Sequence, residues 1–110
     1  MEYTIDKKTY KLHYSLKRLE VLEGVTGVSP LSIVAGMNEQ KFPSISVMKN
    51  YFAYALMDEG GVYAPTKKAI SFAEEYIVQE GFMAVMTAAV EQLMEDCPFL
   101  FQGGSSNSNT

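Results

Sequence analysis

The chain has little of the chemistry on which most catalytic and metal sites depend. Its 110 residues include one cysteine, one histidine and no tryptophan. The single cysteine, Cys97, excludes a disulfide within the chain and is typical of a small core residue. Zinc sites combine several Cys and His ligands, whereas His13 and Cys97 are each alone in this sequence. We therefore expect no metal, no cofactor and no enzymatic activity.

Two further absences narrow the class of protein. Acidic residues outnumber basic ones by 13 to 9, so the chain lacks the positive charge of a general nucleic-acid binder. No apolar run is long enough to span a bilayer, and the N-terminus lacks the basic and apolar regions of a signal peptide. These absences predict a cytoplasmic protein that binds neither nucleic acid nor membranes.

The pattern of apolar residues predicts a mainly α fold with a small N-terminal β-hairpin. Apolar and polar residues alternate in 2–6 and again in 9–15, which is the period of strands with one buried face. Four to five helices follow, and Ser15, Ser29 and either Ser44 or Ser46 are the expected N-caps of the first three. Thr66 is expected to cap the fourth. The helices are expected at about 16–23, 31–37, 45–58, 67–80 and 82–94.

Residues 1–97 are expected to form one domain, and the chemistry changes after Pro98. No hydrophobic residue occurs between Gln102 and Thr110, so this stretch cannot bury enough surface to offset the entropy of ordering. We therefore expect 98–110 to be a disordered tail.

The last expected helix carries more apolar surface than one interface requires. Ten of the thirteen residues from Phe82 to Met94 are apolar, and no side is polar over the first three turns. The helix expected at 45–58 has a second apolar face as well. A chain of this length cannot easily bury two such faces, so we expect another protein to cover part of them. The candidate partner-binding residues are Tyr51, Tyr54, Met83, Met86, Phe99 and Phe101.

Methionine enrichment supports this interpretation, because flexible thioethers recur at adaptable binding surfaces. The alternative, that each methionine fills a gap in the core, stays open from the sequence. The apolar faces and the small hairpin also predict self-association into a homo-oligomer.

Two segments carry a resemblance to a known family. Residues 10–23, YKLHYSLKRLEVLE, join a short strand ending in an aromatic and a serine to a helix with the pattern Leu-x-x-Leu-x-x-Leu-Glu. Residues 51–57, YFAYALM, precede an acidic-glycine break and then Thr66. Over residues 3–80 the chain resembles the tail assembly chaperones of long-tailed, siphovirus-like phages and prophages.

The resemblance implies a function in virion assembly. Such chaperones bind the tape measure protein, keep it soluble until tail tube subunits polymerise around it, and are absent from the mature virion. The resemblance thus implies the cytoplasm of a bacterial host, with the tape measure protein as partner. It also implies a longer, frameshifted form that recruits the tail tube protein. A structural tail or connector protein and a small helical protein-binding regulator remain as alternatives.

Pro98-Phe99-Leu100 can be encoded by CCT TTT TTA, which contains the slippery heptamer T TTT TTA. Two tRNAs can slip back by one base on such a sequence and still pair. We therefore predict a −1 frameshift at or near these codons, replacing the residues after about Leu100. The alternative is a plain disordered C-terminus without a second product.

Overall fold

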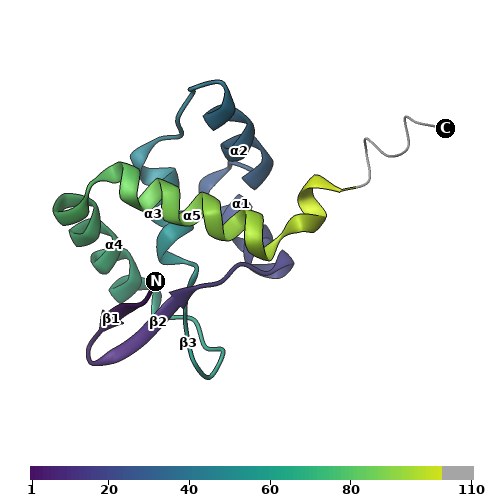
Figure 1. Ribbon diagram of the computed structural model, residues 1–110. Helices are drawn as coiled ribbons and strands as arrows, with labels where there is room; N and C mark the ends of the chain where they lie inside the picture. Colours follow the sequence, from purple (N-terminus) through teal and green to yellow (C-terminus); the bar gives the residue numbers. More distant parts are fainter. Residues whose placement is uncertain (103–110) are drawn as a thin grey trace.

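The computed structural model describes residues 1–102 and is mainly helical, which confirms the expected fold class (Figure 1). An N-terminal strand pair precedes five α-helices, with a third strand between the third and fourth helices. The strands are β1 (Tyr3–Ile5), β2 (Lys8–Leu12) and β3 (Leu56–Asp58). The helices are α1 (Leu16–Thr26), α2 (Pro30–Asn38), α3 (Ile45–Ala53), α4 (Thr66–Glu80) and α5 (Phe82–Asp96), followed by the 3₁₀ turn η1 (Pro98–Phe101).

The predicted hairpin forms through a tight two-residue turn. β1 and β2 pair antiparallel, with Tyr3 opposite Tyr10. Asp6 and Lys7 both adopt positive φ, 51° and 70°, as a turn that matches the right-handed twist of the flanking strands requires. The alternation along both strands places Tyr3, Tyr10 and Leu12 in the core. The hairpin therefore has one face on the helices, as its sequence period indicates.

β3 is the main departure from the expected elements. The helix predicted to run to Asp58 ends at Ala53, and Leu56–Asp58 pair antiparallel with β2 instead. Leu12 lies opposite Leu56, so a core residue of the hairpin gains an apolar cross-strand neighbour. Local residues permit a helix here, but the backbone groups of β2 need partners, and this long-range pairing overrides the local preference.

The N-terminal caps explain where the first three helices begin. Ser15, Ser29 and Ser44 each accept a hydrogen bond from the backbone N–H three residues later, at 3.1 Å in every case. Of the two serines considered for α3, Ser44 is therefore the cap. Thr66 does not cap α4: it is the first helical residue, and Pro65 occupies the N-cap position without a side-chain hydrogen bond.

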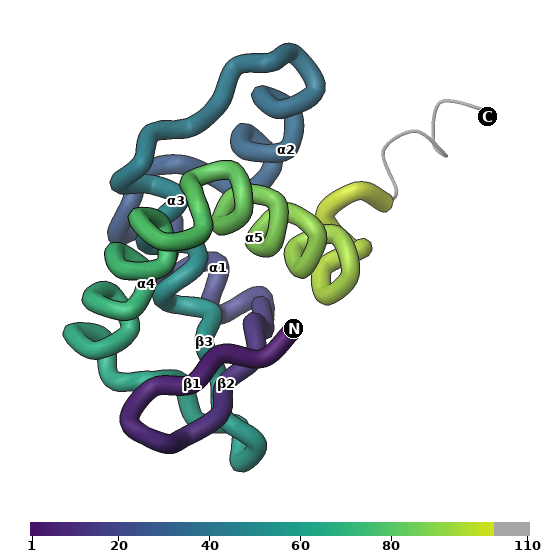
Figure 2. The backbone as a smooth tube through the Cα atoms, turned by 60° about the vertical axis from the view of Figure 1, so that its left-hand side comes forward, coloured from purple at the N-terminus to yellow at the C-terminus, as the bar shows by residue number. Residues whose placement is uncertain are grey.

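α3 lies at the centre of the domain, packed against α1, α4 and α5 (Figure 2). Its buried side chains include Met48, Tyr51 and Phe52, each 0% exposed. An aromatic cluster joins α3 to β1 and α4, with the ring of Tyr3 5.1 Å from Phe52 and 5.4 Å from Tyr76 between centroids. Both distances lie in the range in which edge-to-face packing is favourable.

Two buried tyrosines connect segments that are distant in the sequence. The Tyr14 hydroxyl donates to the carbonyl oxygen of Tyr51 at 2.8 Å, and the Tyr51 hydroxyl donates to the carbonyl oxygen of Val28 at 2.7 Å. Each phenol thus satisfies its polar atom inside an apolar environment, which a buried hydroxyl requires. The pair ties the segment before α1 and the α1–α2 loop to α3.

Arg18 is a half-buried residue of α1. Its guanidinium carbon lies 3.9 Å from the ring centroid of Tyr63 and 5.1 Å from that of Tyr54. Its Nε also donates to the carbonyl oxygen of Tyr54 at 2.6 Å. Arg18 therefore fixes the segment that leads from α3 into β3.

Replacing Arg18 by methionine, which keeps most of the side-chain length, is expected to lower the free energy of unfolding by about 1–2 kcal/mol. The loss combines one hydrogen bond to a backbone carbonyl with two cation–π contacts. Urea unfolding followed by circular dichroism measures the change. Lys17→Met, at an exposed neighbouring position, is the control and should stay within about 0.5 kcal/mol of wild type. Equal losses of stability in both variants would show that the hydrogen bond and the cation–π contacts of Arg18 do not stabilise the fold.

The C-terminal part of the described chain also differs from expectation. Residues 98–101 were expected to begin a disordered tail, but they form η1, and Leu100 packs against the core. The apolar run Phe99–Phe101 supplies that contact, because it offers surface that the polar stretch after it lacks. The rest of the expected tail, 103–110, lies outside the described residues.

Candidate protein-binding surface

Two of the six candidate binding residues lie in the core. Tyr51 and Met86 are each 0% exposed, so the expectation that they form a surface for a partner is wrong. The cause is the central position of α3, which packs against three helices and therefore buries more than one face. α5 packs one broad side against α3, and Met86 belongs to that side together with Val85, Ala89, Val90 and Leu93.

The other four candidates lie at least partly on the surface. Met83, Phe99 and Phe101 are exposed by 54%, 45% and 43%. Tyr54 is half-buried, with its ring beside Arg18, and so offers a partner less surface. Three of the six predicted side chains are thus exposed apolar groups on α5 and η1.

Met94 is an exposed apolar residue that was not among the candidates. It is 54% exposed, as Met83 is, and the two lie about three turns apart along one side of α5. The helical spacing was visible in the sequence, but only the packing of α5 on α3 decides which side stays outside. Met83, Met94, Phe99 and Phe101 are the exposed large apolar side chains of α5 and η1 among residues 1–102, and we refer to them as the C-terminal apolar surface.

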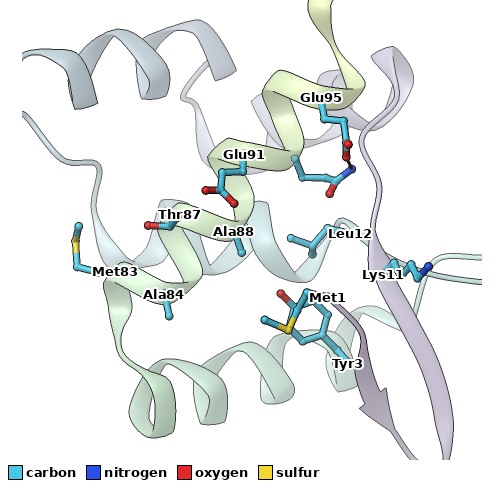
Figure 3. Close-up of a pocket in the computed structure, with 11 residues that line it drawn as sticks. Met1, Tyr3, Lys11, Leu12, Met83, Ala84, Thr87, Ala88, Glu91 and Glu95 are labelled. Atoms are coloured by element: carbon cyan, nitrogen blue, oxygen red, sulfur yellow. Dashed lines mark hydrogen bonds between the residues drawn. The ribbon is translucent and has the colours of Figure 1, made fainter.

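A groove of about 680 Å³ runs between α5 and the N-terminal hairpin (Figure 3). Ala84 and Ala88 point from α5 towards Met1, Tyr3 and Leu12 across the groove. Tyr3 and Leu12 are buried, so they form its floor, whereas Met1 is 88% exposed. Small or apolar side chains therefore line both sides of the groove, with the polar side chains of Thr87 and Gln92 among them on α5.

Acidic side chains dominate the charged rim of this groove. Glu91 and Glu95 lie one turn apart on α5, and within residues 1–102 neither is within 4.0 Å of a cationic group. Among residues 1–102, the cationic groups in the lining are the Lys11 side chain and the α-amino group of Met1, and the Nζ of Lys11 lies 4.0 Å from the Glu2 carboxylate. The α5 side of the groove therefore presents two carboxylates without a counter-charge.

Within residues 1–102, no three His, Cys, Asp or Glu residues gather in a group that could hold a metal ion. Cys97 is a buried free thiol, as predicted, and burial raises its pKa. Over the same residues no single helix is long and apolar enough to cross a membrane; α1 and α2 reach that threshold only as a pair bent by 78°.

Asp96 anchors the end of α5, and with it the C-terminal apolar surface, to the segment before α1. Its Oδ2 accepts a hydrogen bond from the backbone N–H of Tyr14 at 2.9 Å and lies 3.6 Å from Nδ1 of His13. Its Oδ1 accepts from Gln92 at 3.0 Å. The side chain is only 15% exposed, so these contacts are partly shielded from water.

Asp96→Ala is expected to lower the free energy of unfolding by about 1–3 kcal/mol, because the partly buried N–H of Tyr14 loses its acceptor. Glu95→Ala is the matched control, since Glu95 is exposed and its side chain, within residues 1–102, accepts a hydrogen bond from Gln92 alone; we expect a change within about 0.5 kcal/mol. Thermal and urea denaturation of the two variants check the difference. If Asp96→Ala were as stable as Glu95→Ala, the anchoring role would be refuted.

Comparisons of the chain with known protein families, curated proteins and solved structures found no match.

Proposed function

We propose that this chain is a phage tail assembly chaperone that covers apolar helical stretches of the tape measure protein and keeps that protein soluble. The observation that carries the proposal is the C-terminal apolar surface, because α5 and η1 leave four large apolar side chains on the outside of a small domain. Such a surface has a function when a partner covers it, and flexible methionines adapt to irregular partners. The sequence resemblance over residues 3–80 supplies the identity of that partner.

The remaining features fit a binding protein of this kind. The net charge of −4 favours solubility of the chain and of a complex that it forms with an apolar client. The mainly helical fold offers rigid faces, against which an apolar helix can pack in the manner of helix-in-groove recognition. We propose in addition that a −1 frameshift near the codons of Pro98–Leu100 yields a longer product, whose extension recruits the tail tube protein.

The proposed frameshift can be tested separately, in the coding sequence of the gene. The coding sequence should contain a slippery heptamer within codons 95 to 110, followed by an overlapping −1 reading frame. Mass spectrometry of the expressed products should then find a second, longer chain with the same N-terminal peptides. A gene without the heptamer or without the overlapping frame would falsify the proposed frameshift, but it would not affect the proposal that the chain binds the client.

Changing the C-terminal apolar surface should weaken client binding. In cells that co-express the tape measure protein, Phe99→Ser combined with Phe101→Ser should reduce the recovered soluble client several-fold, because two exposed aromatic anchors are lost. The control is Val25→Ser combined with Val78→Ser, which removes exposed apolar side chains from α1 and α4 instead. Equal recovery with both double variants would place the binding surface elsewhere on the domain.

A further inference from the structure

We propose that the groove between α5 and the hairpin binds a helical segment whose apolar face is flanked by lysine or arginine. The identification of this segment as part of the tape measure protein rests on the proposed function above. The chemistry of the occupant, an amphipathic basic helix, is argued from the groove itself. Its apolar lining determines which face of the segment is buried, and its acidic rim determines the charge beside that face.

The shape of the groove suits a helix. Ala84 and Ala88 are one turn apart and point into it, so their small side chains allow another helix to approach α5 closely (Figure 3). The α5 side of the groove extends from Met83 to Glu95, which corresponds to roughly 18 Å along a helix axis. About three turns of a partner helix would therefore lie along it, with apolar residues three and four positions apart facing Tyr3 and Leu12.

The charge of the groove selects a basic partner. Glu91 and Glu95 are both exposed and, within residues 1–102, have no cationic neighbour within 4.0 Å. Lys11, across the groove, already lies beside Glu2. A lysine or arginine next to the apolar face of an incoming helix would therefore meet two unpaired carboxylates, and an acidic helix would meet repulsion.

A second copy of this chain fits the groove less well. Its exposed apolar side chains on α1 stand among Glu20 and Glu23, and Val78 at the end of α4 stands beside Glu80. At the start of α4, Lys68 already pairs with Asp6. The C-terminal turns of α1 or α4 from another copy would thus bring carboxylates towards Glu91 and Glu95, whereas a basic segment of a different protein would not.

The test uses the full chain and two synthetic helical peptides of roughly 18 residues, a length at which helices begin to be stable. Both carry leucine at i, i+3, i+4 and i+7 spacing with alanine elsewhere; one has lysine and the other glutamate on the flanks. Fluorescence anisotropy at low salt measures the affinity of each. We expect the lysine peptide to bind and the glutamate peptide to bind at least roughly tenfold more weakly.

Charge-reversal variants separate the groove from the general acidity of the chain. Glu91→Lys with Glu95→Lys should weaken the lysine peptide roughly tenfold and strengthen the glutamate peptide. Glu20→Lys with Glu80→Lys has the same net charge, changes exposed residues outside the groove, and should alter neither affinity by more than about twofold. Equal effects of the two double variants would overturn the proposal.

A second pair of variants tests the apolar lining. Ala84→Gln fills the groove with a longer, polar side chain and should reduce affinity for the lysine peptide, whereas Val78→Gln on α4 lies outside the groove and should not. Circular dichroism melting confirms that each variant is folded. Unchanged binding by Ala84→Gln, or no binding of the lysine peptide to wild type, would also overturn the proposal.

Two further results separate failure of the groove proposal from failure of the proposed chaperone function. If wild type keeps the tape measure protein soluble and both groove variants do so equally well, the groove proposal fails and the chaperone function stands. If sedimentation shows that wild type self-associates, and Glu91→Lys with Glu95→Lys abolishes this without affecting peptide binding, the occupant is a second copy and the proposal fails.

Discussion

Met86→Ala is expected to lower the free energy of unfolding by about 2–5 kcal/mol. Met86 is 0% exposed on the side of α5 that packs against α3, so removing its side chain leaves a cavity that the surrounding helices can only partly close. For a domain of this size such a loss is a large fraction of the total stability. Urea unfolding followed by circular dichroism measures it directly.

The matched control for this prediction is Met83→Ala on the same helix. Met83 is 54% exposed, so its truncation should change the free energy of unfolding by less than about 0.5 kcal/mol. The two substitutions remove the same atoms from positions three residues apart, and only the packing of α5 separates them. Similar losses at both positions would contradict the described orientation of α5.

A steep loss of stability above about pH 10 is the second large effect that we expect. Burial, together with the nearby Tyr76, raises the pKa of Tyr3 from 10.0 to about 12. Burial and the nearby Glu23 raise the pKa of Tyr51 to about 12. Burial also holds the pKa of Tyr14 well above its ordinary value. The folded state therefore retains phenol protons that the unfolded chain releases.

The sign of the effect follows from proton linkage. Below pH 10 both states keep their phenol protons, so the stability from these tyrosines is fully present. Between about pH 10 and about pH 12 the unfolded chain binds fewer protons, and each such tyrosine lowers the free energy of unfolding by up to about 1.4 kcal/mol per pH unit. The raised pKa of the buried Cys97 thiol acts in the same direction from its ordinary value of 9.0 upwards.

Urea unfolding at a series of pH values, with phenolate absorbance as a second readout, measures this dependence. Tyr14→Phe should reduce the slope by up to one proton, because the fully buried phenol no longer contributes, and should cost about 1 kcal/mol at neutral pH for the lost hydrogen bond to Tyr51. A stability that stays constant through this pH range, or a slope that Tyr14→Phe leaves unchanged, would refute the assignment.

Local chemistry made much of the fold predictable. The alternation around Tyr3 and Tyr10 identified the hairpin, and Ser15 and Ser29 marked helix starts, because capping and strand periodicity act between near neighbours in the chain. β3 was missed, since its residues are compatible with a helix and only the pairing with β2, some 45 residues earlier, makes them a strand. Such long-range pairing leaves no local pattern.

The candidate binding residues also show that local sequence patterns do not reveal how distant segments pack. A second apolar face on a helix indicates either a partner or a central position, and periodicity alone does not distinguish the two. Tyr51 and Met86 are buried because α3 occupies the central position in the domain, whereas the side chain of Met83 is exposed. The groove depends on how α5 crosses the hairpin, so no spacing in the sequence connects Ala84 with Leu12.

The most direct test of the proposed chaperone function is co-expression of this chain with the tape measure protein of the same genome. With the chain present, the client should move from the insoluble to the soluble fraction and should co-purify with the chain, while purified virions should contain the client without the chain. A client that is equally insoluble with and without the chain, or a chain retained in the virion, would contradict the account.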